Sequence, residues 1–319
     1  MRSKGSVLIT GCSNGGIGSG LAVAFQQKGY QVFATARNTE KMSDLKGVFS
    51  LNLLQLDVLN PEDVHAAVNA VTETTGGTLS VLINNAGSFH QMPLLDDDIE
   101  AAKKTFDTNV WGPLALTKAF APLLIRDRGM LVNITSIAGH NAVPYSGVYG
   151  ASKRSLEHLS EVLRLELHPF QVKVLSVVTG GVASDSQAFG DSALPPSSLY
   201  KPIEATIEES RGNSAYARMP VMEYANQVVG HIEIGSTGKV WVGSHAEDAK
   251  KASWNPEVAT QWVRNFQAPG FPERDRLTFL LGTVYVEKYG IDGFVGEIWG
   301  TTNWNIQLSL QSWMRLAVH

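Results

Sequence analysis

The chain has 319 residues, of which 44% are hydrophobic and 18% are charged, so it can bury a sizeable core and is not globally disordered. Its formal net charge of −4 gives no sign of the basic face that nucleic-acid-binding proteins use. The single cysteine, Cys12, excludes an internal disulfide and fits a reducing compartment.

The sequence shows neither a targeting signal nor a membrane-spanning stretch. The N-terminus is polar, and its first apolar run, Val7-Leu8-Ile9, is too short for the core of a signal peptide. No window reaches the roughly 18 apolar residues that a spanning helix needs. We therefore expect a soluble protein, with peripheral membrane contact left open.

Short apolar runs alternate with amphipathic patterns from the N-terminus to about residue 232. The runs predict strands at residues 6–10, 31–36, 53–56, 80–83, 130–134 and 172–178. The patterns predict helices around residues 21–28, at 61–75, about 97–126, about 146–167 and at 220–232. Continuous apolar strands separated by helices are typical of a parallel sheet covered on both faces. The predicted fold class is therefore α/β, a doubly wound parallel sheet of the Rossmann type.

The alternation loosens after Gly180. Residues 181–200 are rich in Ser, Ala and Gly, which predicts a mobile surface segment. We expect one Rossmann-type domain over residues 1–240, including a lid over about 181–220. An atypical extension, 241–319, contains six of the seven tryptophans. It is interpreted as an extra subdomain packed on the core, with a dimer- or membrane-facing surface and a poorly ordered segment as alternatives.

A glycine-rich loop connects the first predicted strand to the first predicted helix. Glycines let backbone amides approach a pyrophosphate closely, and the helix N-terminus adds partial positive charge. This context is the one that a dinucleotide site requires, although an ordinary glycine-rich turn is the alternative. The loop residues expected to contact the cofactor are Gly11, Ser13, Gly16, Ile17 and Gly18.

The end of the second predicted strand bears on which dinucleotide binds. An acidic residue about 20 positions past the loop would bind the ribose 2′-hydroxyl of NAD. The sequence has Arg37 there instead. Because a guanidinium pairs with a 2′-phosphate, we expect NADP(H), with a solvated surface charge as the alternative interpretation of Arg37.

Two residues with acid–base potential, Tyr149 and Lys153, stand four positions apart in a predicted helix and so share a face. A nearby ammonium should lower the pKa of a phenol and make it a better proton shuttle at neutral pH. Ser136 ends the fifth predicted strand, and Asn109 lies in the long predicted helix. The run Asn84-Asn85-Ala86-Gly87 ends the fourth predicted strand.

Together and in this order, these motifs resemble the short-chain dehydrogenase/reductase family over about residues 5–235. The resemblance implies an NADP(H)-dependent oxidoreductase in which Tyr149 gives its proton to a carbonyl oxygen. It implies that Lys153 contacts the nicotinamide ribose and lowers the pKa of Tyr149, that Ser136 orients the carbonyl, and that Asn109 holds a water. Further cofactor contacts are implied for Asp57, Val58, Asn85, Ala86, Gly87, Gly180 and Val182.

The chain departs from the family pattern near both ends of the cofactor cleft. The glycine loop carries one extra residue between Gly11 and Gly16, but Gly16-Ile17-Gly18 is intact, so the phosphate site is expected to survive. The usual Pro-Gly after the sixth strand is Thr179-Gly180, and Ser184 stands where a threonine is expected. The resemblance implies that these positions help to hold the nicotinamide end of the cofactor.

Several segments are similar to the fungal NADPH-dependent 1-acyl-dihydroxyacetone-phosphate reductase group, which includes many secondary-metabolite reductases. They are residues 10–13, 34–37, 92–96, 108–113 and 198–202. The resemblance implies reduction of a largely apolar ketone, either a secondary-metabolite intermediate or an acyl-dihydroxyacetone-phosphate-like lipid. It also implies a homodimer or homotetramer and a cytoplasmic location, with peripheral association with endoplasmic reticulum or lipid droplets left open.

Two other functions stay open from the sequence. A cofactor-binding but catalytically inactive scaffold or partner protein is suggested by the altered Thr179-Gly180 segment and the unusual tail. The second open function is that of an NADP-dependent alcohol dehydrogenase acting on a steroid- or retinol-like substrate.

Some conspicuous residues are given ordinary roles. His90 and His140 are interpreted as loop histidines at the pocket rim, with a place in the substrate pocket as the alternative. Residues 96–98 (Asp-Asp-Asp) are interpreted as a charge cluster that favours a helix N-terminus. Cys12 is interpreted as a small packing residue, and the spacing of Cys and His suggests no zinc site.

Overall fold

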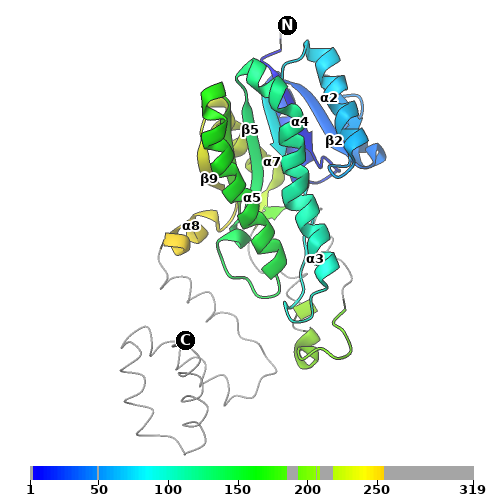
Figure 1. The fold of residues 1–319 in the computed structure, drawn as a ribbon, viewed down its shortest axis with the longest axis vertical. Coiled ribbons are helices and arrows are strands. Elements are labelled where there is room, and N and C mark those ends of the chain that lie inside the picture. The colour runs from blue at the N-terminus through cyan, green and yellow to red at the C-terminus, as the bar shows by residue number, and fades with distance from the viewer. Residues whose placement is uncertain (1–2, 49, 185–192, 206, 209–217, 255–319) are drawn as a thin grey trace, which may run out of the picture. The chain divides into compact units, whose positions relative to one another are not determined.

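The structure is a computed structural model that describes residues 3–48, 50–184, 193–205, 207–208 and 218–254. These residues contain a seven-stranded parallel sheet in the order β3-β2-β1-β4-β5-β6-β9, covered by helices (Figure 1). The predicted fold class, a doubly wound parallel sheet, is confirmed.

The elements have the following bounds. The sheet consists of β1 (Ser6–Thr10), β2 (Gln31–Ala36), β3 (Leu51–Gln55), β4 (Val81–Asn84), β5 (Met130–Ser136), β6 (Lys173–Thr179) and β9 (Gly238–Val242). A small parallel pair is formed by β7 (Val182–Ala183) and β8 (Met219–Pro220). The helices are α1 (Ile17–Gln27), α2 (Pro61–Thr75), α3 (Ile99–Phe106), α4 (Gly112–Asp127), α5 (Gly147–Glu166), α7 (Val221–Glu233) and α8 (Ala246–Trp254). The short helical turns are η1 (Thr39–Leu45), η2 (Asp107–Trp111), η3 (Ile137–Gly139), η4 (His168–Phe170) and η5 (Lys201–Ile203).

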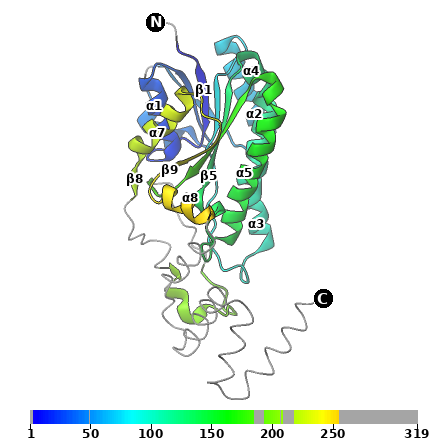
Figure 2. The same ribbon diagram turned by 90° about the vertical axis from the view of Figure 1, so that its left-hand side faces the viewer.

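Two hydrophobic layers hold the sheet between helices. On one face, α1 and α7 bury side chains such as Phe25 and Tyr224 against the strands. On the other face, α2 and α4 bury Val71 and Phe120, and Leu163 of α5 packs on the same layer. Figure 2 shows this division, with α1 and α7 on one side of the sheet and α2, α4 and α5 on the other. Removal of these apolar surfaces from water is the main stabilising contribution.

Local signals in the sequence set the ends of the helices. In α2, the Asn60 side chain accepts a hydrogen bond from the Glu62 amide, Pro61 occupies the first turn, and Gly76 ends the helix in the left-handed region with φ of 74°. The long predicted helix over 97–126 consists instead of α3, the π-helical turn η2 and α4. A π turn inserts an extra residue into the helix without ending the apolar periodicity on either side.

The structure contains a strand and a helix that the sequence pattern does not predict. β9 pairs in parallel with β6, and α8 follows it. β9 crosses residue 240, where the sequence predicts the domain boundary. The remainder of the predicted extension, from residue 255, lies outside the described residues, as do parts of the predicted lid. In the part of the chain that the structure describes, no helix is long and apolar enough to cross a bilayer.

Candidate active site

The residues predicted to be catalytic come from neighbouring elements at the carboxyl edge of the sheet. Ser136 is the last residue of β5, while Tyr149 and Lys153 lie in the first half of α5. β4, the strand next to β5, leads into Asn85-Ala86-Gly87. This edge is where open α/β sheets bind their ligands, because parallel strands all end there.

Tyr149, Ser136 and Lys153 form one cluster. The hydroxyl of Ser136 is a hydrogen-bond partner of the Tyr149 phenol. The Lys153 ammonium nitrogen lies 5.9 Å from the centre of the Tyr149 ring and donates a 3.0 Å hydrogen bond to the Ile134 carbonyl. Phe89, which the sequence pattern does not single out, packs its ring 4.7 Å from that of Tyr149.

Burial moves both acid–base groups in this cluster. It raises the pKa of the Tyr149 phenol above its ordinary value, and the hydrogen bond with Ser136 opposes this rise only in part. Burial also lowers the pKa of Lys153 to about 8. The sequence predicts a lowered pKa for Tyr149, but the pKa is raised in this structure, because loss of hydration has the largest effect on the phenol. The phenol stays protonated at neutral pH.

Asn109 lies in η2, fully buried beside this cluster. Its side-chain amide donates to the Ser88 carbonyl at 2.8 Å and to the Ser152 hydroxyl at 2.9 Å, and its oxygen accepts from the Ser88 amide at 2.7 Å. A Cβ on Gly87 would lie 3.2 Å from that oxygen and 3.3 Å from the Lys153 nitrogen. Gly87 is therefore in close contact with both side chains, and a larger residue there would press on the Lys153 ammonium.

The glycine loop is packed against the end of β4. Gly11 has φ of 73°, and the Asn85 side-chain amide donates to its carbonyl at 3.0 Å. A Cβ on Gly18 would meet the Gly11 carbonyl oxygen and would lie 2.7 Å from the Asn85 amide nitrogen. Only glycine at position 18 therefore allows the loop and β4 to approach this closely.

The first turn of α1 has the features of a phosphate site. Gly16 occupies the N-cap without a side-chain hydrogen bond, Ile17 follows, and no acidic residue stands in the first turn. Its amides are left to a ligand, and the helix dipole favours an anion there. Ser13 lies in the same loop, where the Gly16 amide donates to its carbonyl at 3.1 Å. The loop fits the pyrophosphate of a dinucleotide.

The remaining predicted cofactor residues divide into exposed and buried side chains. Arg37 is exposed directly after β2, and Asp57 is partly buried with its carboxylate accepting from the Leu59 amide at 3.0 Å. Val58 and Val182 are 7% and 3% exposed, so their side chains belong to the core. Any cofactor contact from these two valines would come from their main chains.

The altered segment after β6 is well connected. The Gly180 amide donates to the Val242 carbonyl at 2.8 Å. Thr179, at the place of the usual proline, has its hydroxyl 2.7 Å from that of the buried Tyr224. The threonine thus provides a buried side-chain hydrogen bond to α7 that a proline cannot make.

Known proteins with this architecture decide the assignment. Residues 5–193 match the family described as short chain dehydrogenase. The chain belongs to this family. It is 47% identical over 229 residues to a short-chain dehydrogenase of Penicillium ochrochloron, covering 71% of this chain and 84% of the other. It is 37% identical over 281 residues to an NADPH-dependent 1-acyldihydroxyacetone phosphate reductase of Schizosaccharomyces pombe, covering 83% and 94% of the two chains.

Solved structures agree with this assignment. A short-chain dehydrogenase of Streptomyces avermitilis superposes with a TM-score of 0.70 at 27% identity, covering 83% of this chain and 98% of the other. A short chain dehydrogenase of Burkholderia cenocepacia in complex with NADP has a TM-score of 0.66 at 25% identity, covering 82% and 98%. The predicted family and the predicted oxidoreductase class are confirmed.

Substituting Gly18 with alanine in this short-chain dehydrogenase should destabilise the fold by about 1–3 kcal/mol, because the new methyl group meets the Gly11 carbonyl. Cofactor affinity should fall with it, since the same loop receives the pyrophosphate. The control is Gly230→Ala in α7, where a Cβ has no atom within 4 Å. Helix propensity should make this control neutral or more stable. Urea unfolding of both variants tests the difference, and equal stabilities would contradict it.

Three acidic residues before α3 in this dehydrogenase have separate partners. Asp98 is the N-cap of α3, with its carboxylate accepting from the Glu100 and Ala101 amides, as the sequence pattern suggests. Asp97 accepts from the His90 ring at 2.7 Å, and Asp96 accepts from the Ser198 hydroxyl at 2.6 Å. Only Asp98 therefore caps the helix. Asp96 instead connects this loop to the described part of the predicted lid.

Cys12 is fully buried in the hydrophobic layer under the glycine loop. Burial raises the pKa of its thiol to about 12, so it carries no thiolate at neutral pH. The interpretation of Cys12 as a packing residue agrees with this environment.

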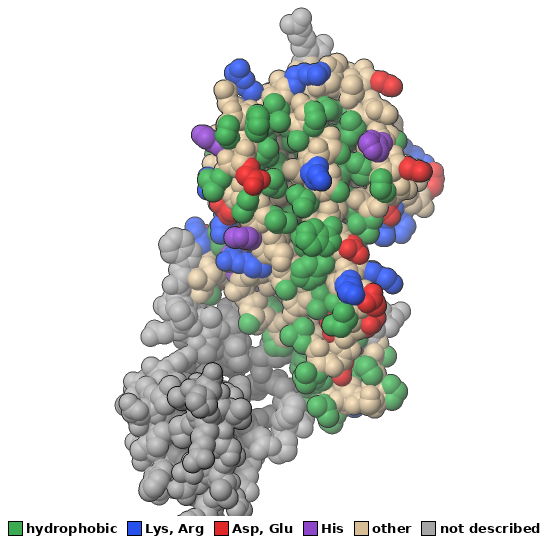
Figure 3. Space-filling view, viewed as in Figure 1, with side chains coloured by type: hydrophobic (Ala, Val, Ile, Leu, Met, Phe, Trp, Pro, Cys, Tyr) green, Lys and Arg blue, Asp and Glu red, His purple; other side chains and the backbone are tan. Residues whose placement is uncertain are grey.

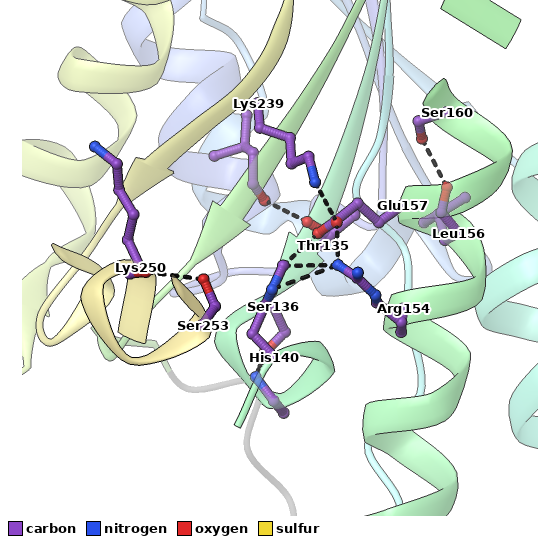
Figure 4. Close-up of polar contacts among 12 residues, drawn as sticks. Thr135, Ser136, His140, Arg154, Leu156, Glu157, Ser160, Lys239, Lys250 and Ser253 are labelled. Atoms are coloured by element: carbon purple, nitrogen blue, oxygen red, sulfur yellow. Dashed lines mark hydrogen bonds and ion pairs between the residues drawn. The ribbon is translucent and has the colours of Figure 1, made fainter. Parts of the chain in front are cut away.

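His140 lies in the turn after η3, as interpreted, but its side chain is buried and not at an exposed rim. Its side chain is 7% exposed and donates a 2.6 Å hydrogen bond to Glu157 in α5. Arg154 and Lys239 donate to the same carboxylate at 2.6 Å and 3.0 Å (Figure 4). Burial alone would raise the pKa of Glu157, but the hydrogen bonds and charges of His140 and Lys239 outweigh it and hold the pKa below its ordinary value.

Acid should therefore weaken the fold through Glu157. A depressed carboxyl pKa contributes stability that is present above the unfolded-state pKa and is lost as pH falls through the folded-state value. Glu157→Gln should cost about 2 kcal/mol at pH 7 and flatten the dependence of stability on pH below about 4.5. Urea unfolding at pH 7 and at a pH below about 4.5 measures the free energy of unfolding in both conditions. The matched control is Glu161→Gln, one turn later, whose half-exposed pair with Arg164 should contribute little. An equal pH dependence in Glu157→Gln and wild type would contradict the prediction.

Proposed function

We propose that this enzyme is an NADPH-dependent carbonyl reductase that transfers hydride to the ketone of a largely apolar substrate. The observation that carries the proposal is the cluster of Tyr149, Ser136 and buried Lys153. The Tyr149 phenol, whose pKa burial raises further above neutrality, is in the protonated form that a proton donor to a carbonyl oxygen needs.

NADPH is proposed over NADH because of the end of β2. Arg37 stands there with its side chain exposed, and the glycine loop is held beside it by a 2.8 Å hydrogen bond from the Cys12 amide to the Thr35 carbonyl. A guanidinium at that place can pair with a 2′-phosphate. The names of the relatives from Schizosaccharomyces pombe and Burkholderia cenocepacia, which mention NADPH and NADP, support the same choice.

The protein groups supply the acid–base part of the reaction. When bound, NADPH supplies the hydride, and the protein provides binding and orientation. Tyr149 donates its phenolic proton to the carbonyl oxygen of the substrate, and Ser136 orients that oxygen by a hydrogen bond. Lys153 stabilises the phenolate that the proton transfer leaves on Tyr149. The family resemblance also implies that Lys153 contacts the nicotinamide ribose.

An apolar substrate is proposed from the surroundings of the cluster. Phe89 packs on Tyr149, and Met92, three residues later in the chain, forms a small hydrophobic cluster with Leu194 and Ile203 of the predicted lid. The Met92 amide donates to the Tyr145 carbonyl at 2.7 Å. Such apolar surroundings favour a ketone with a hydrocarbon body. This substrate class includes secondary-metabolite intermediates and lipids of the acyl-dihydroxyacetone-phosphate type.

The experiment is NADPH oxidation by the purified full chain with a panel of hydrophobic ketones that includes decalone. The proposal expects turnover with at least one ketone and much slower turnover with NADH. NADP-dependent oxidation of alcohols without ketone reduction near neutral pH would favour the dehydrogenase alternative. Cofactor binding without any turnover would favour the inactive scaffold, against which the presence of Asn109, Ser136, Tyr149 and Lys153 together argues.

We also propose a homodimer or homotetramer that pairs through α4 and α5. Trp111, the last residue of η2 and the N-cap of α4, is 54% exposed, and Leu165, in α5, is 65% exposed. Figure 3 shows hydrophobic side chains on the face where Figure 1 places these helices. Leu165→Glu should convert the oligomer to monomers in light scattering. Ile234→Glu, at an exposed residue after α7, should not. A monomeric wild type would contradict the proposal.

A further inference from the structure

The turn that follows Ser136 is pressed directly onto α5. A Cβ on Gly150 would lie 2.5 Å from the carbonyl oxygen of Ala138, so helix and turn touch through their backbones. Within the turn, the Ala138 amide donates to the Ser136 hydroxyl at 3.2 Å, and the His140 amide donates to the Ile137 carbonyl at 2.9 Å. The position of the Ser136 side chain therefore depends on how η3 sits on α5.

Glu157 joins that turn to two other elements. Its side chain is 3% exposed, and it accepts hydrogen bonds from His140 after η3, from Arg154 in α5 and from Lys239 in β9 (Figure 4). A carboxylate this buried is costly unless each oxygen is well partnered, and these donors satisfy that requirement. The His140 ring also packs 4.6 Å from Trp241 of β9.

The spacing along the chain connects this ionic cluster to the acid–base residues. Glu157 lies four residues after Lys153 and eight after Tyr149 on α5, which places all three along one side of the helix. His140 lies four residues after Ser136. The contact between Glu157 and His140 therefore joins the element that carries Tyr149 and Lys153 to the element that carries Ser136.

We propose that Glu157 is a positioning residue that, acting through His140, holds η3 against α5 and so fixes the Ser136 hydroxyl beside the Tyr149 phenol. The inference rests on the proposed carbonyl reductase function and goes beyond it by assigning a residue that touches no reacting atom. Small displacements of such groups are expensive, because a misplacement of about 1 Å can cost about 100-fold in rate. The other titratable side chains that line the same surface are His231 of α7 and the ion pair of Glu247 with Lys250 in α8, which are 3.2 Å apart.

The test compares Glu157→Gln with Glu161→Gln on the same helix, using decalone or whichever ketone of the panel the wild type reduces. Glu157→Gln should lower kcat by about 10-fold or more while the NADPH dissociation constant, measured by fluorescence, changes less than twofold. Glu161→Gln should leave both unchanged. Because the Ser136 hydrogen bond lowers the pKa of Tyr149, the alkaline limb of the pH–rate profile should move to higher pH in Glu157→Gln only.

A second variant and a second readout keep the result decisive. His140→Phe preserves a ring against Trp241 but removes the hydrogen bond to Glu157, and it should reproduce the loss of kcat. Amide hydrogen exchange over residues 136–141 should be faster in both variants, with exchange in β1 and α1 unchanged. A wild type that reduces no ketone would refute the proposed function, and the positioning role of Glu157 would then be tested by hydrogen exchange alone. Exchange rates and kcat equal to those of the wild type in both variants would overturn the positioning role.

Discussion

Tyr149→Phe should lower kcat for ketone reduction by about 1,000-fold, which lies within the range that general acid catalysis contributes. The phenol is the group held protonated in the cluster, with Ser136 as its hydrogen-bond partner and Lys153 5.9 Å from its ring. Phenylalanine keeps the ring contact with Phe89 but has no proton to give. NADPH binding, measured by fluorescence titration, should remain within about twofold, since the Lys153 side chain and the glycine loop are unchanged.

The matched control for this variant is Tyr30→Phe. Tyr30 is also partly buried and packs edge-to-face on Phe25, 5.1 Å away, but it lies before β2 at the opposite edge of the sheet. Its loss should leave kcat unchanged. Retention of more than about one tenth of wild-type turnover in Tyr149→Phe, with Tyr30→Phe behaving as wild type, would remove the proposed acid from the mechanism.

Arg37→Glu should shift the preference for NADPH over NADH by about 100-fold or more. The substitution removes a charge-assisted hydrogen bond to a 2′-phosphate and replaces it with repulsion, and each effect is worth about tenfold or more. The KM for NADH should stay the same or fall, because the new carboxylate can accept a hydrogen bond from the ribose 2′-hydroxyl of NADH. Steady-state kinetics with both cofactors at a fixed ketone concentration measure the ratio.

The control for Arg37→Glu makes the same charge change elsewhere. Arg128 is exposed and precedes β5, at the amino edge of the sheet. Arg128→Glu should leave the cofactor preference unchanged. A ratio in Arg37→Glu equal to that of the wild type would show that Arg37 is a solvated surface charge, which is the alternative interpretation of this residue.

The fold was predictable because the buried parallel strands are continuous apolar runs. β1 and β2 have the predicted bounds, Ser6–Thr10 and Gln31–Ala36, and α2 has its predicted limits because Pro61 and Gly76 mark both ends. β9 was not predicted, since Gly238 and Lys239 interrupt its short apolar pattern and its pairing with β6 comes from tertiary structure. The turn η2 could not be distinguished from the long predicted helix, because the helical periodicity of apolar residues continues through it.

The candidate site was predictable where its residues form local motifs and not where they meet only in space. Tyr149 and Lys153 are one helical turn apart, so their proximity follows from spacing alone. The contact of Phe89 with Tyr149 and the bonds from Asn109 to Ser88 depend on how segments pack. The direction of the Tyr149 pKa was mispredicted because spacing reveals the nearby ammonium but not the loss of hydration.

Glu157 illustrates a signal that the sequence does contain. It continues the face of α5 that bears Tyr149 and Lys153, and an acidic residue at a buried helical position requires partners. That reasoning could have predicted a buried ion pair. It could not have identified His140 or Lys239 as the partners, since they are 17 and 82 residues away in the sequence.

The most direct measurement of the central claim traces the hydride with a deuterium label and removes the proton donor by substitution. Wild type and Tyr149→Phe are incubated in single turnover with NADPH deuterated at the transferred position and a ketone that the wild type reduces, and the alcohol is analysed by mass spectrometry. The account predicts deuterium on the carbinol carbon of the wild-type product, and almost no product from Tyr149→Phe at equal cofactor occupancy. Equal yields of deuterated alcohol from both proteins would contradict it.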